Sequence, residues 1–204
     1  MTTTAQTAGD LAGNPFAAPS GLPYGLPDFA AVRDEHYLPA FRAGMATQLA
    51  EIEAIVTDPA PPDEDNTLLA LERSGRLLHR VALAFFNVVS ADRSPQIAEI
   101  EAEIAPLLAA HRDAIYLDRR LFDRVEALAA RVDDGEVDLP ADAAWLLHTL
   151  RKDFGRAGVS APSEVQAEVR EANTRISGLE TTFGQRLVAD ANASAVLLPE
   201  AADL

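Results

Sequence analysis

Apolar residues recur at three- and four-residue steps along most of the chain, and this spacing constrains the fold more than any other feature. The longest run has steps of four, three, four, three, four and four: Val165, Val169, Ala172, Ile176, Leu179, Phe183 and Leu187. Because one face of an α-helix repeats every 3.6 residues, this run predicts one long helix. Its seam is close to a heptad repeat, which indicates packing along an antiparallel neighbour.

Five earlier segments show the same spacing and are predicted to be helices: 35–56, 66–89, 95–115, 121–128 and 141–157. Pro106 should kink or divide the third of them, because proline lacks the amide hydrogen of a helical turn. Strand signals are scarce, since no alternating β-branched run lies beside an Asn-Gly or Asp-Gly turn. The predicted fold class is therefore all-α, with about six helices packed largely antiparallel and ending in one long helix.

Local signals also mark the starts of helices. Ser94 precedes a proline and should cap the helix that follows it. Asn66 or Thr67 is expected to cap the segment that ends near residue 89. Ser163 and Gln166 have the spacing of a capping box, which predicts that the last helix begins there.

A proline-rich arm precedes the helices. Residues 14–29 hold four of the 13 prolines, which favour extended backbone, and several apolar side chains that would pin the arm onto a surface. Residues 1–13 carry neither Lys nor Arg and no long apolar run, so neither a secretory signal nor a transit peptide is expected. We therefore divide the chain into a disordered tail (1–13), an extended arm (14–34) and a helical region (35–204).

The balance of charge narrows the range of partners. Asp and Glu number 32 against 17 Lys and Arg, a formal net charge of −15. Such a chain repels phosphate backbones and anionic lipid surfaces, so neither nucleic acid nor a membrane is expected as a partner. No stretch approaches the ~18 apolar residues of a membrane span. The absence of cysteine excludes disulfides and thiolate ligands, and it favours a cytoplasmic location.

Histidines give the most direct test for a metal site. A zincin carries the motif HExxH, which places two imidazoles on one helical face beside a general base. None of the four histidines is followed by glutamate, and no two are four residues apart: His36, His79, His111 and His148. His111 lies on the apolar face of its helix and is expected to be a core residue with satisfied hydrogen bonds. All four are expected to be structural.

Carboxylate clusters and nucleophile motifs lead to the same expectation. Glu99, Glu101 and Glu103 alternate around a helix, which is typical of a solvated face. The acidic runs at 63–65 and 133–134 lack the ligand spacing of a calcium loop. Neither a G-x-S-x-G elbow nor a P-loop is present. The sequence thus predicts no catalytic, cofactor-binding or metal-ligating residue in this chain.

Eight stretches, in order along the chain, carry a family resemblance. They are NPF (14–16), LPY (22–24), HYLPAFRAGM (36–45), NTLLALERSGRLLHRV (66–81), FF (85–86), IYLxxxLFxRV (115–125), Phe154 with Ala157-Gly158, and TTFGQRLVADANAS (181–194). With them the chain resembles the N-terminal region of bacterial peptidyl-dipeptidases, which are zinc metallopeptidases of the thimet oligopeptidase/oligopeptidase A family. The ordered set covers nearly everything after residue 13.

This resemblance implies a helical zinc peptidase of two lobes around a deep channel, which releases C-terminal dipeptides from short peptides. In that family an HExxH helix and a downstream glutamate, all in the C-terminal half, hold the metal. The sequence ends at Leu204, before that half begins, so the catalytic half is expected to be the missing partner. The resemblance therefore implies that 35–204 is a non-catalytic N-terminal lobe, which walls and roofs the channel and is inactive alone.

A stand-alone helical interaction or scaffold module without peptidase activity is the alternative hypothesis. In a segment of a larger enzyme, the seam of the last helix would be exposed as an apolar patch larger than the roughly 300–600 Å² usual for a monomer. A stand-alone module would carry polar residues there or a dedicated dimer interface. A third hypothesis, a non-metal hydrolase, would require a pocket that brings Ser, His and Asp together.

Overall fold

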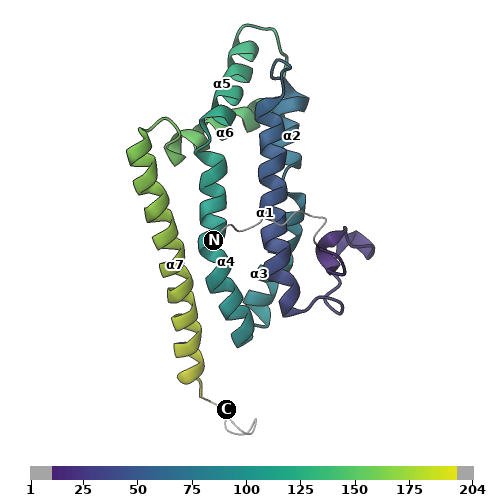
Figure 1. Cartoon of the computed structure of the whole chain (residues 1–204), viewed down its shortest axis with the longest axis vertical. Helices are drawn as coiled ribbons and strands as arrows, with labels where there is room; N and C mark the ends of the chain where they lie inside the picture. Colours follow the sequence, from purple (N-terminus) through teal and green to yellow (C-terminus); the bar gives the residue numbers. More distant parts are fainter. Residues whose placement is uncertain (1–10, 197–204) are drawn as a thin grey trace.

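The computed structural model describes residues 11–196, and every regular element in that range is helical (Figure 1). The α-helices are α1 (Asp34–Thr57), α2 (Ala70–Arg73), α3 (Arg76–Ala91), α4 (Pro95–Tyr116), α5 (Arg119–Asp133), α6 (Ala141–Ala157) and α7 (Ser163–Ala193). Because α2 is a single turn, six helices of substantial length remain, which confirms the all-α prediction. The long helix α4 is undivided at Pro106.

A first core cluster joins the arm to α1, α3 and the N-terminal half of α4. Its centre is a group of aromatic rings, in which Phe85 of α3 lies edge-on against Tyr37 and Phe41 of α1 at centroid distances of 5.0 and 5.4 Å. Phe16 of the arm adds a further ring 5.6 Å from Tyr37. Edge-to-face contacts of this kind stabilise one arrangement of the rings beyond the burial of their area. A core contact therefore holds the arm to the helices.

A second core cluster lies toward the other end of α1 and joins it to α5, α6 and the end of α4. Leu128 of α5 and Phe154 of α6 are fully buried there. Arg124 of α5 extends from this cluster and donates to the carbonyl of Asp58 (2.9 Å) and to Oγ1 of Thr67 (3.1 Å). These bonds fasten the proline-rich loop after α1 to α5.

The long helix α7 runs antiparallel to α4 along one edge of the molecule (Figure 1). Polar side chains make specific bonds across this contact: Asn173 Nδ2 donates to Asp113 Oδ1 (2.7 Å), and Gln185 Nε2 donates to the carbonyl of Ala98 (3.0 Å). No described α7 side chain is buried. The predicted antiparallel neighbour is therefore present, but it does not cover the apolar seam.

The prediction of one continuous helix over 66–89 is wrong. The chain forms a π-helical turn, η4 (Glu64–Leu69), then α2 and α3, which are separated at Ser74 and Gly75. Gly75 has a φ of 71°, a left-handed conformation that glycine adopts without steric cost. A Cβ at this position would also lie 2.5 Å from Cδ of Gln48. A Ser-Gly pair within a regular apolar pattern was the local signal for this break.

The predicted helix starts have mixed outcomes. Ser94 caps α4 as predicted, because its Oγ accepts from the amide of Ile97 (3.1 Å). The cap predicted at Asn66 or Thr67 is wrong. Asp63 is the cap residue of η4, and its Oδ1 accepts from the amide of Asn66 (2.8 Å).

The capping box predicted at Ser163 and Gln166 is also wrong. Pro162 is the cap residue, and Ser163 is already the first residue of α7. The side-chain amide of Gln166 donates to the carbonyls of Val159 (2.9 Å) and Ala161 (3.4 Å) instead. It therefore ties the start of α7 back to the preceding turn.

The arm is irregular apart from two short 3-10 turns, η2 (Pro15–Ala17) and η3 (Pro23–Gly25). Two hydrogen bonds fasten it: Asn14 Nδ2 donates to the carbonyl of His36 (2.9 Å), and Arg80 of α3 donates to the carbonyl of Phe16 (3.2 Å). Together with the ring of Phe16, they hold the arm along α1 and α3.

The predicted tail is described only at its end, since residues 1–10 lie outside the described residues. Leu11 is 2% exposed and belongs to the first core cluster, so the packed part of the chain begins before residue 14. Among the described helices, none combines the length and apolar character needed to cross a membrane.

Candidate functional site

The structure places the four histidines in separate environments. His36 lies at the start of α1, where its Nδ1 accepts from the amide of Arg33 (3.0 Å). His79 is exposed on α3 and His148 is exposed on α6, whereas His111 is buried in α4. Within residues 11–196, no three His, Cys, Asp or Glu side chains lie together in a way that could hold a metal ion.

His111 forms part of a hydrogen-bonded link between α4, α1 and the turn before α3. Its Nε2 lies 2.7 Å from Oε1 of Gln48, and Nε2 of Gln48 donates to Oγ of Ser74 (3.2 Å). Its Nδ1 is buried without a hydrogen-bond partner, so the expected hydrogen bonding of His111 is met at Nε2 but not at Nδ1. Burial lowers the pKa of His111 below its ordinary value, which keeps the ring neutral near pH 7. This geometry describes a structural histidine.

The alternation of the α4 glutamates predicts a solvated face. This prediction holds for Glu99 and Glu103 but is wrong for Glu101, whose side chain is only 15% exposed. Glu99 is exposed, Glu101 pairs with Arg93, and Glu103 pairs with Arg42 of α1 at 2.6 Å. Glu101 and Glu103 are each held in an ion pair with an arginine, so they do not form a pair of adjacent, unpaired carboxylates. The cluster therefore offers no general acid and base.

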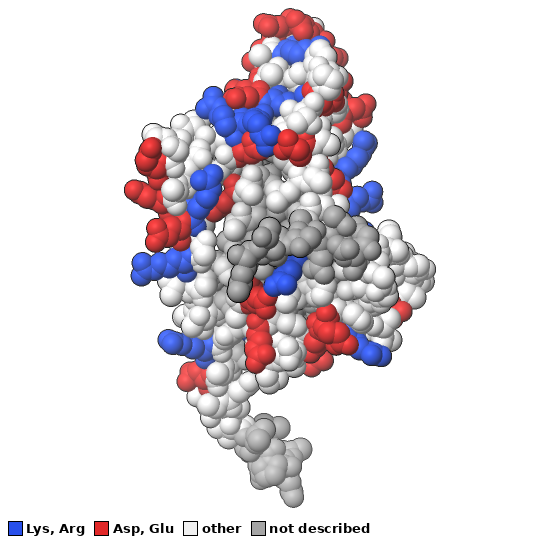
Figure 2. Space-filling model, viewed as in Figure 1, with Lys and Arg blue, Asp and Glu red and all other residues white. Residues whose placement is uncertain are grey.

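Figure 2 shows charged side chains of both signs close together at the end of the molecule where α5 lies, with others spread along α7 and over the lower half of this face. Arg120 of α5 binds both carboxylate oxygens of Glu53 on α1 (3.0 and 2.9 Å) and also binds Asp118. Burial opposes ionisation of Asp118, but the bonds from Arg120 outweigh this effect and lower its pKa. Arg151 of α6 pairs with Glu126 in the same region (2.7 Å). These charges neutralise one another at the surface.

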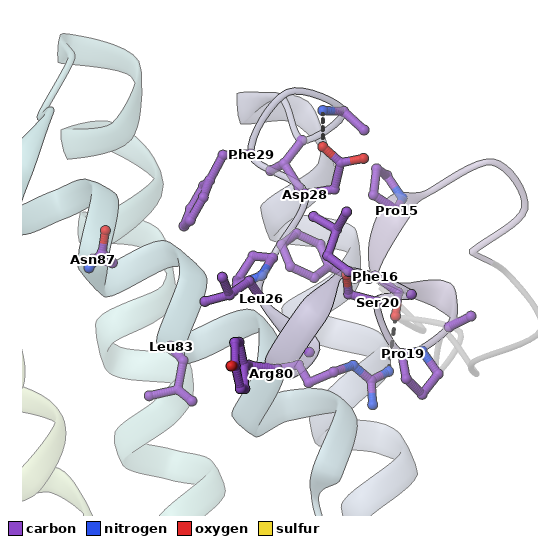
Figure 3. Close-up of a pocket in the computed structure, with 18 residues that line it drawn as sticks. Pro15, Phe16, Pro19, Ser20, Leu26, Asp28, Phe29, Arg80, Leu83 and Asn87 are labelled. Atoms are coloured by element: carbon purple, nitrogen blue, oxygen red, sulfur yellow. Dashed lines mark hydrogen bonds between the residues drawn. The ribbon is translucent and has the colours of Figure 1, made fainter.

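A groove of about 800 Å³ lies between the arm and α3. Figure 3 shows Leu26 and Phe29 of the arm extended toward the helix that carries Leu83, with Arg80 crossing between arm and helix. Among the described residues that line the groove, the titratable side chains are Tyr24, Asp28 and Arg80. Arg80 donates a hydrogen bond to the carbonyl of Phe16 and so anchors the arm. Burial lowers the pKa of its guanidinium. The groove is a mainly apolar surface without a nucleophile beside a base.

The apolar seam of α7 is the second surface of interest. Four large side chains along it are at least half exposed: Ile176 (50%), Leu179 (59%), Phe183 (69%) and Leu187 (59%). We call these four residues the α7 stripe. The spacing of the sequence found this seam, but no described element of the chain covers it.

A pocket of about 490 Å³, which we call the three-helix pocket, lies beside the stripe where α4, α6 and α7 meet. Ile176 belongs to the stripe and also lines this pocket. Asp113 of α4 lines the pocket and is 7% exposed. Its Oδ1 accepts from Asn173, but its Oδ2 is buried without a hydrogen-bond partner. No local sequence pattern points to Asp113, because its partner Asn173 lies 60 residues away along the chain.

No protein-family model matches the chain. Among curated proteins, the dipeptidyl carboxypeptidase of Salmonella typhimurium is 37% identical over 188 residues, which are 92% of this chain and 27% of the relative. The Escherichia coli protein of the same name is 35% identical over 191 residues, or 94% of this chain and 28% of the relative. Oligopeptidase A of S. typhimurium is 25% identical over 81% of this chain and 24% of the relative.

The chain is homologous to a segment of these bacterial peptidases. It spans about a quarter of the length of the curated relatives that it matches. Because the homology takes in 92% of the chain, it includes most of the helical region described above. Both dipeptidyl carboxypeptidases match at similar identity and coverage, which confirms the resemblance seen in the ordered sequence stretches.

Proposed function

We propose that the chain is a non-catalytic helical segment of a zinc metallopeptidase of the peptidyl-dipeptidase type, and that it corresponds to the N-terminal region of such an enzyme. The alignment with S. typhimurium dipeptidyl carboxypeptidase carries this proposal, because it takes in 92% of the chain but only 27% of the relative. A segment of a larger enzyme would give a match of this kind.

In this proposal, residues outside the chain bind the zinc ion, which would polarise the scissile carbonyl and activate water. The sequence contains no HExxH motif, and residues 11–196 offer no group of three ligands. The residues present therefore do not fit the metal, and we assign them no step in peptide hydrolysis.

The proposed role of the segment is to wall and roof a substrate channel. Its support is the packing of the arm, α1, α3 and α4 into one core, which makes a preformed helical wall. Such a wall would restrict access to short, unstructured peptides. The apolar character of the exposed α7 stripe adds support against a stand-alone module with a polar last helix. Its area, on the order of 500 Å², stays within the range usual for a monomer, so the size of the patch does not separate a segment from a stand-alone module with a dimer interface.

The proposed lack of zinc binding and peptidase activity in this segment is tested with the purified 204-residue chain. We expect no zinc bound in stoichiometric amount and no hydrolysis of a blocked short peptide when zinc is added. Full-length S. typhimurium dipeptidyl carboxypeptidase, assayed in parallel, is the positive control. Chelator-sensitive release of a dipeptide by the chain alone would contradict the proposal, since it would require a site among His36, His79, His111 and His148.

The assignment to a peptidase is tested with a chimera. The segment of the S. typhimurium enzyme that aligns with this chain is replaced by the corresponding residues of this chain. We expect the chimera to release dipeptides, because a homologous wall should support the same channel. A chimera that is folded by circular dichroism but inactive would contradict the proposed role.

A further inference from the structure

We infer that the α7 stripe and the three-helix pocket together dock one amphipathic helix from the remainder of the peptidase. That helix lays an apolar seam along the stripe and places one Lys or Arg beside Asp113. The inference rests on the proposed function and specifies the chemistry of the partner.

The stripe has the area and the spacing of a helix-binding surface. Its four side chains expose on the order of 500 Å², at the upper end of what a monomer leaves uncovered. Their near-heptad spacing fits a second long helix that crosses at about 20°, because knobs at such positions enter the holes of a neighbouring helix.

The contact with α4 leaves the stripe free. Asn173, which bonds to α4, lies about 60° around α7 from Ile176, and Gln185 lies still further from the stripe. A second helix can therefore pack on α7 without displacing α4. It would convert α7 from an edge helix into an internal one.

The three-helix pocket contains a buried carboxylate, Asp113, that the docking helix must satisfy with a polar group. Arg112 stacks on Tyr116, with Cζ 5.5 Å from the ring centroid, and Arg156 pairs with Asp153 at 3.7 Å. Within the described part of the chain, no cation forms an ion pair with Asp113. A buried carboxylate oxygen without a partner is costly, and a guanidinium or ammonium group from outside would satisfy it.

One helix can meet both requirements, because Ile176 belongs to the stripe and also lines the pocket. The partner is therefore amphipathic, with a cation on the flank of its seam that faces α4. This arrangement explains two otherwise separate features, an uncovered apolar seam and an unsatisfied buried carboxylate.

A second copy of the chain fits these requirements less well. In an antiparallel pair of α7 helices, each flank of the seam faces the same flank of the other copy. The flank beside the pocket carries Gln166, Asn173 and Glu180, which include no cation for Asp113. The relatives, in contrast, have nearly three-quarters of their length outside the matched segment, which provides ample sequence for a docking helix.

The test uses the 204-residue chain and an array of overlapping peptides that cover the unmatched part of S. typhimurium dipeptidyl carboxypeptidase. We expect binding to concentrate in one helical segment that combines an apolar heptad seam with a Lys or Arg. Phe183→Glu should abolish this binding. Leu83→Glu, an exposed apolar residue on α3, is the matched control and should leave binding unchanged.

A double-mutant cycle tests the contact with Asp113. Replacement of the peptide's cation by Gln should weaken binding to the wild-type chain about tenfold or more, as the loss of a charge-assisted hydrogen bond requires. The same peptide change should have little further effect on the Asp113→Asn variant. Additive effects of the two changes would overturn the role of Asp113, provided that thermal unfolding shows the variant to be folded.

Three other outcomes would overturn the docking inference. They are an array without a binding peptide, binding that Phe183→Glu leaves intact, and a concentration-dependent dimer in sedimentation experiments that the same substitution abolishes. The last result would make a second copy the occupant. An inactive chimera together with a bound, cation-dependent helix would instead contradict the proposed channel role and leave the docking surface in place.

Discussion

Gly44 of α1 lies so close to Leu78 of α3 that a Cβ at Gly44 would be 2.8 Å from Cα and 2.9 Å from the amide nitrogen of Leu78. The two helices therefore touch through their backbones, and the aromatic cluster of Tyr37, Phe41 and Phe85 forms beside this contact. The contact fixes the spacing of the two helices that carry most of the first core cluster.

Gly44→Ala should therefore destabilise the chain by about 1–3 kcal/mol, because a methyl group would force two helix backbones apart. Gly178→Ala is the control: it lies inside α7 with no atom within 4 Å of the added Cβ. That change should raise helix stability by up to ~1 kcal/mol. Urea unfolding followed by circular dichroism would measure both. Equal effects of the two substitutions would contradict the close approach at Gly44.

Arg124 should be needed to hold the proline-rich loop against α5. Its largely buried guanidinium donates to the carbonyl of Asp58 and to Oγ1 of Thr67. Arg124→Lys cannot reproduce this fork of donors and should cost about 2–3 kcal/mol of unfolding free energy. Arg119→Lys, at an exposed pair with Asp123, should cost less than ~1 kcal/mol. A loss at Arg119 as large as that at Arg124 would count against this account.

His111 should make the stability of the chain depend on pH. Burial lowers its pKa in the folded state below the ordinary value of 6.5. The unfolded chain therefore takes up a proton at this residue before the folded chain does, and stability should fall as the pH drops below about 6.5 toward the folded pKa. The loss is about 1.4 kcal/mol for each unit by which the folded pKa is lowered.

The measurement compares the unfolding free energy at about pH 7.5 and about pH 5 in the wild type and in His111→Gln, a side chain that does not titrate. The fall in stability should be smaller in the variant. His79→Gln, on the exposed face of α3, is the control and should retain the wild-type fall. An unchanged fall in His111→Gln would show that other groups account for it.

Periodicity predicted most of the helices, because burial of one helical face leaves its mark in local sequence. It failed at Gly75, whose left-handed backbone breaks the helix that the apolar spacing predicts, and where Gln48 leaves no room for a Cβ. The same reasoning located the seam of α7 and predicted an antiparallel neighbour, but that neighbour, α4, does not cover the seam. An apolar seam records that a helix packs there and does not record which one.

The contact that α7 does make was outside the reach of local patterns. It depends on bonds from Asn173 to Asp113 and from Gln185 to the carbonyl of Ala98, which span 60 and 87 residues. Polar residues at such positions look the same in sequence as solvent-exposed ones. For the same reason, the unsatisfied oxygen of Asp113 and the three-helix pocket emerged only from the structure.

Tyr24 should be a source of strain in the arm. It has a φ of 61° and a ψ of 13°, in the left-handed region that costs a non-glycine residue about 1 kcal/mol or more, and its side chain is fully exposed. Tyr24→Gly removes the Cβ that causes the strain, but it also adds conformational freedom to the unfolded chain. The net result should be a gain of a few tenths to about 1 kcal/mol in unfolding free energy.

The matched control is Tyr24→Ala, which keeps the Cβ and removes the ring. It should leave stability nearly unchanged, because the fully exposed ring contributes little packing. Thermal and urea unfolding of the two variants separate backbone strain from side-chain contact. If both substitutions lowered stability by the same amount, the ring of Tyr24 would be making a stabilising contact with the groove, and backbone strain would not be the dominant effect.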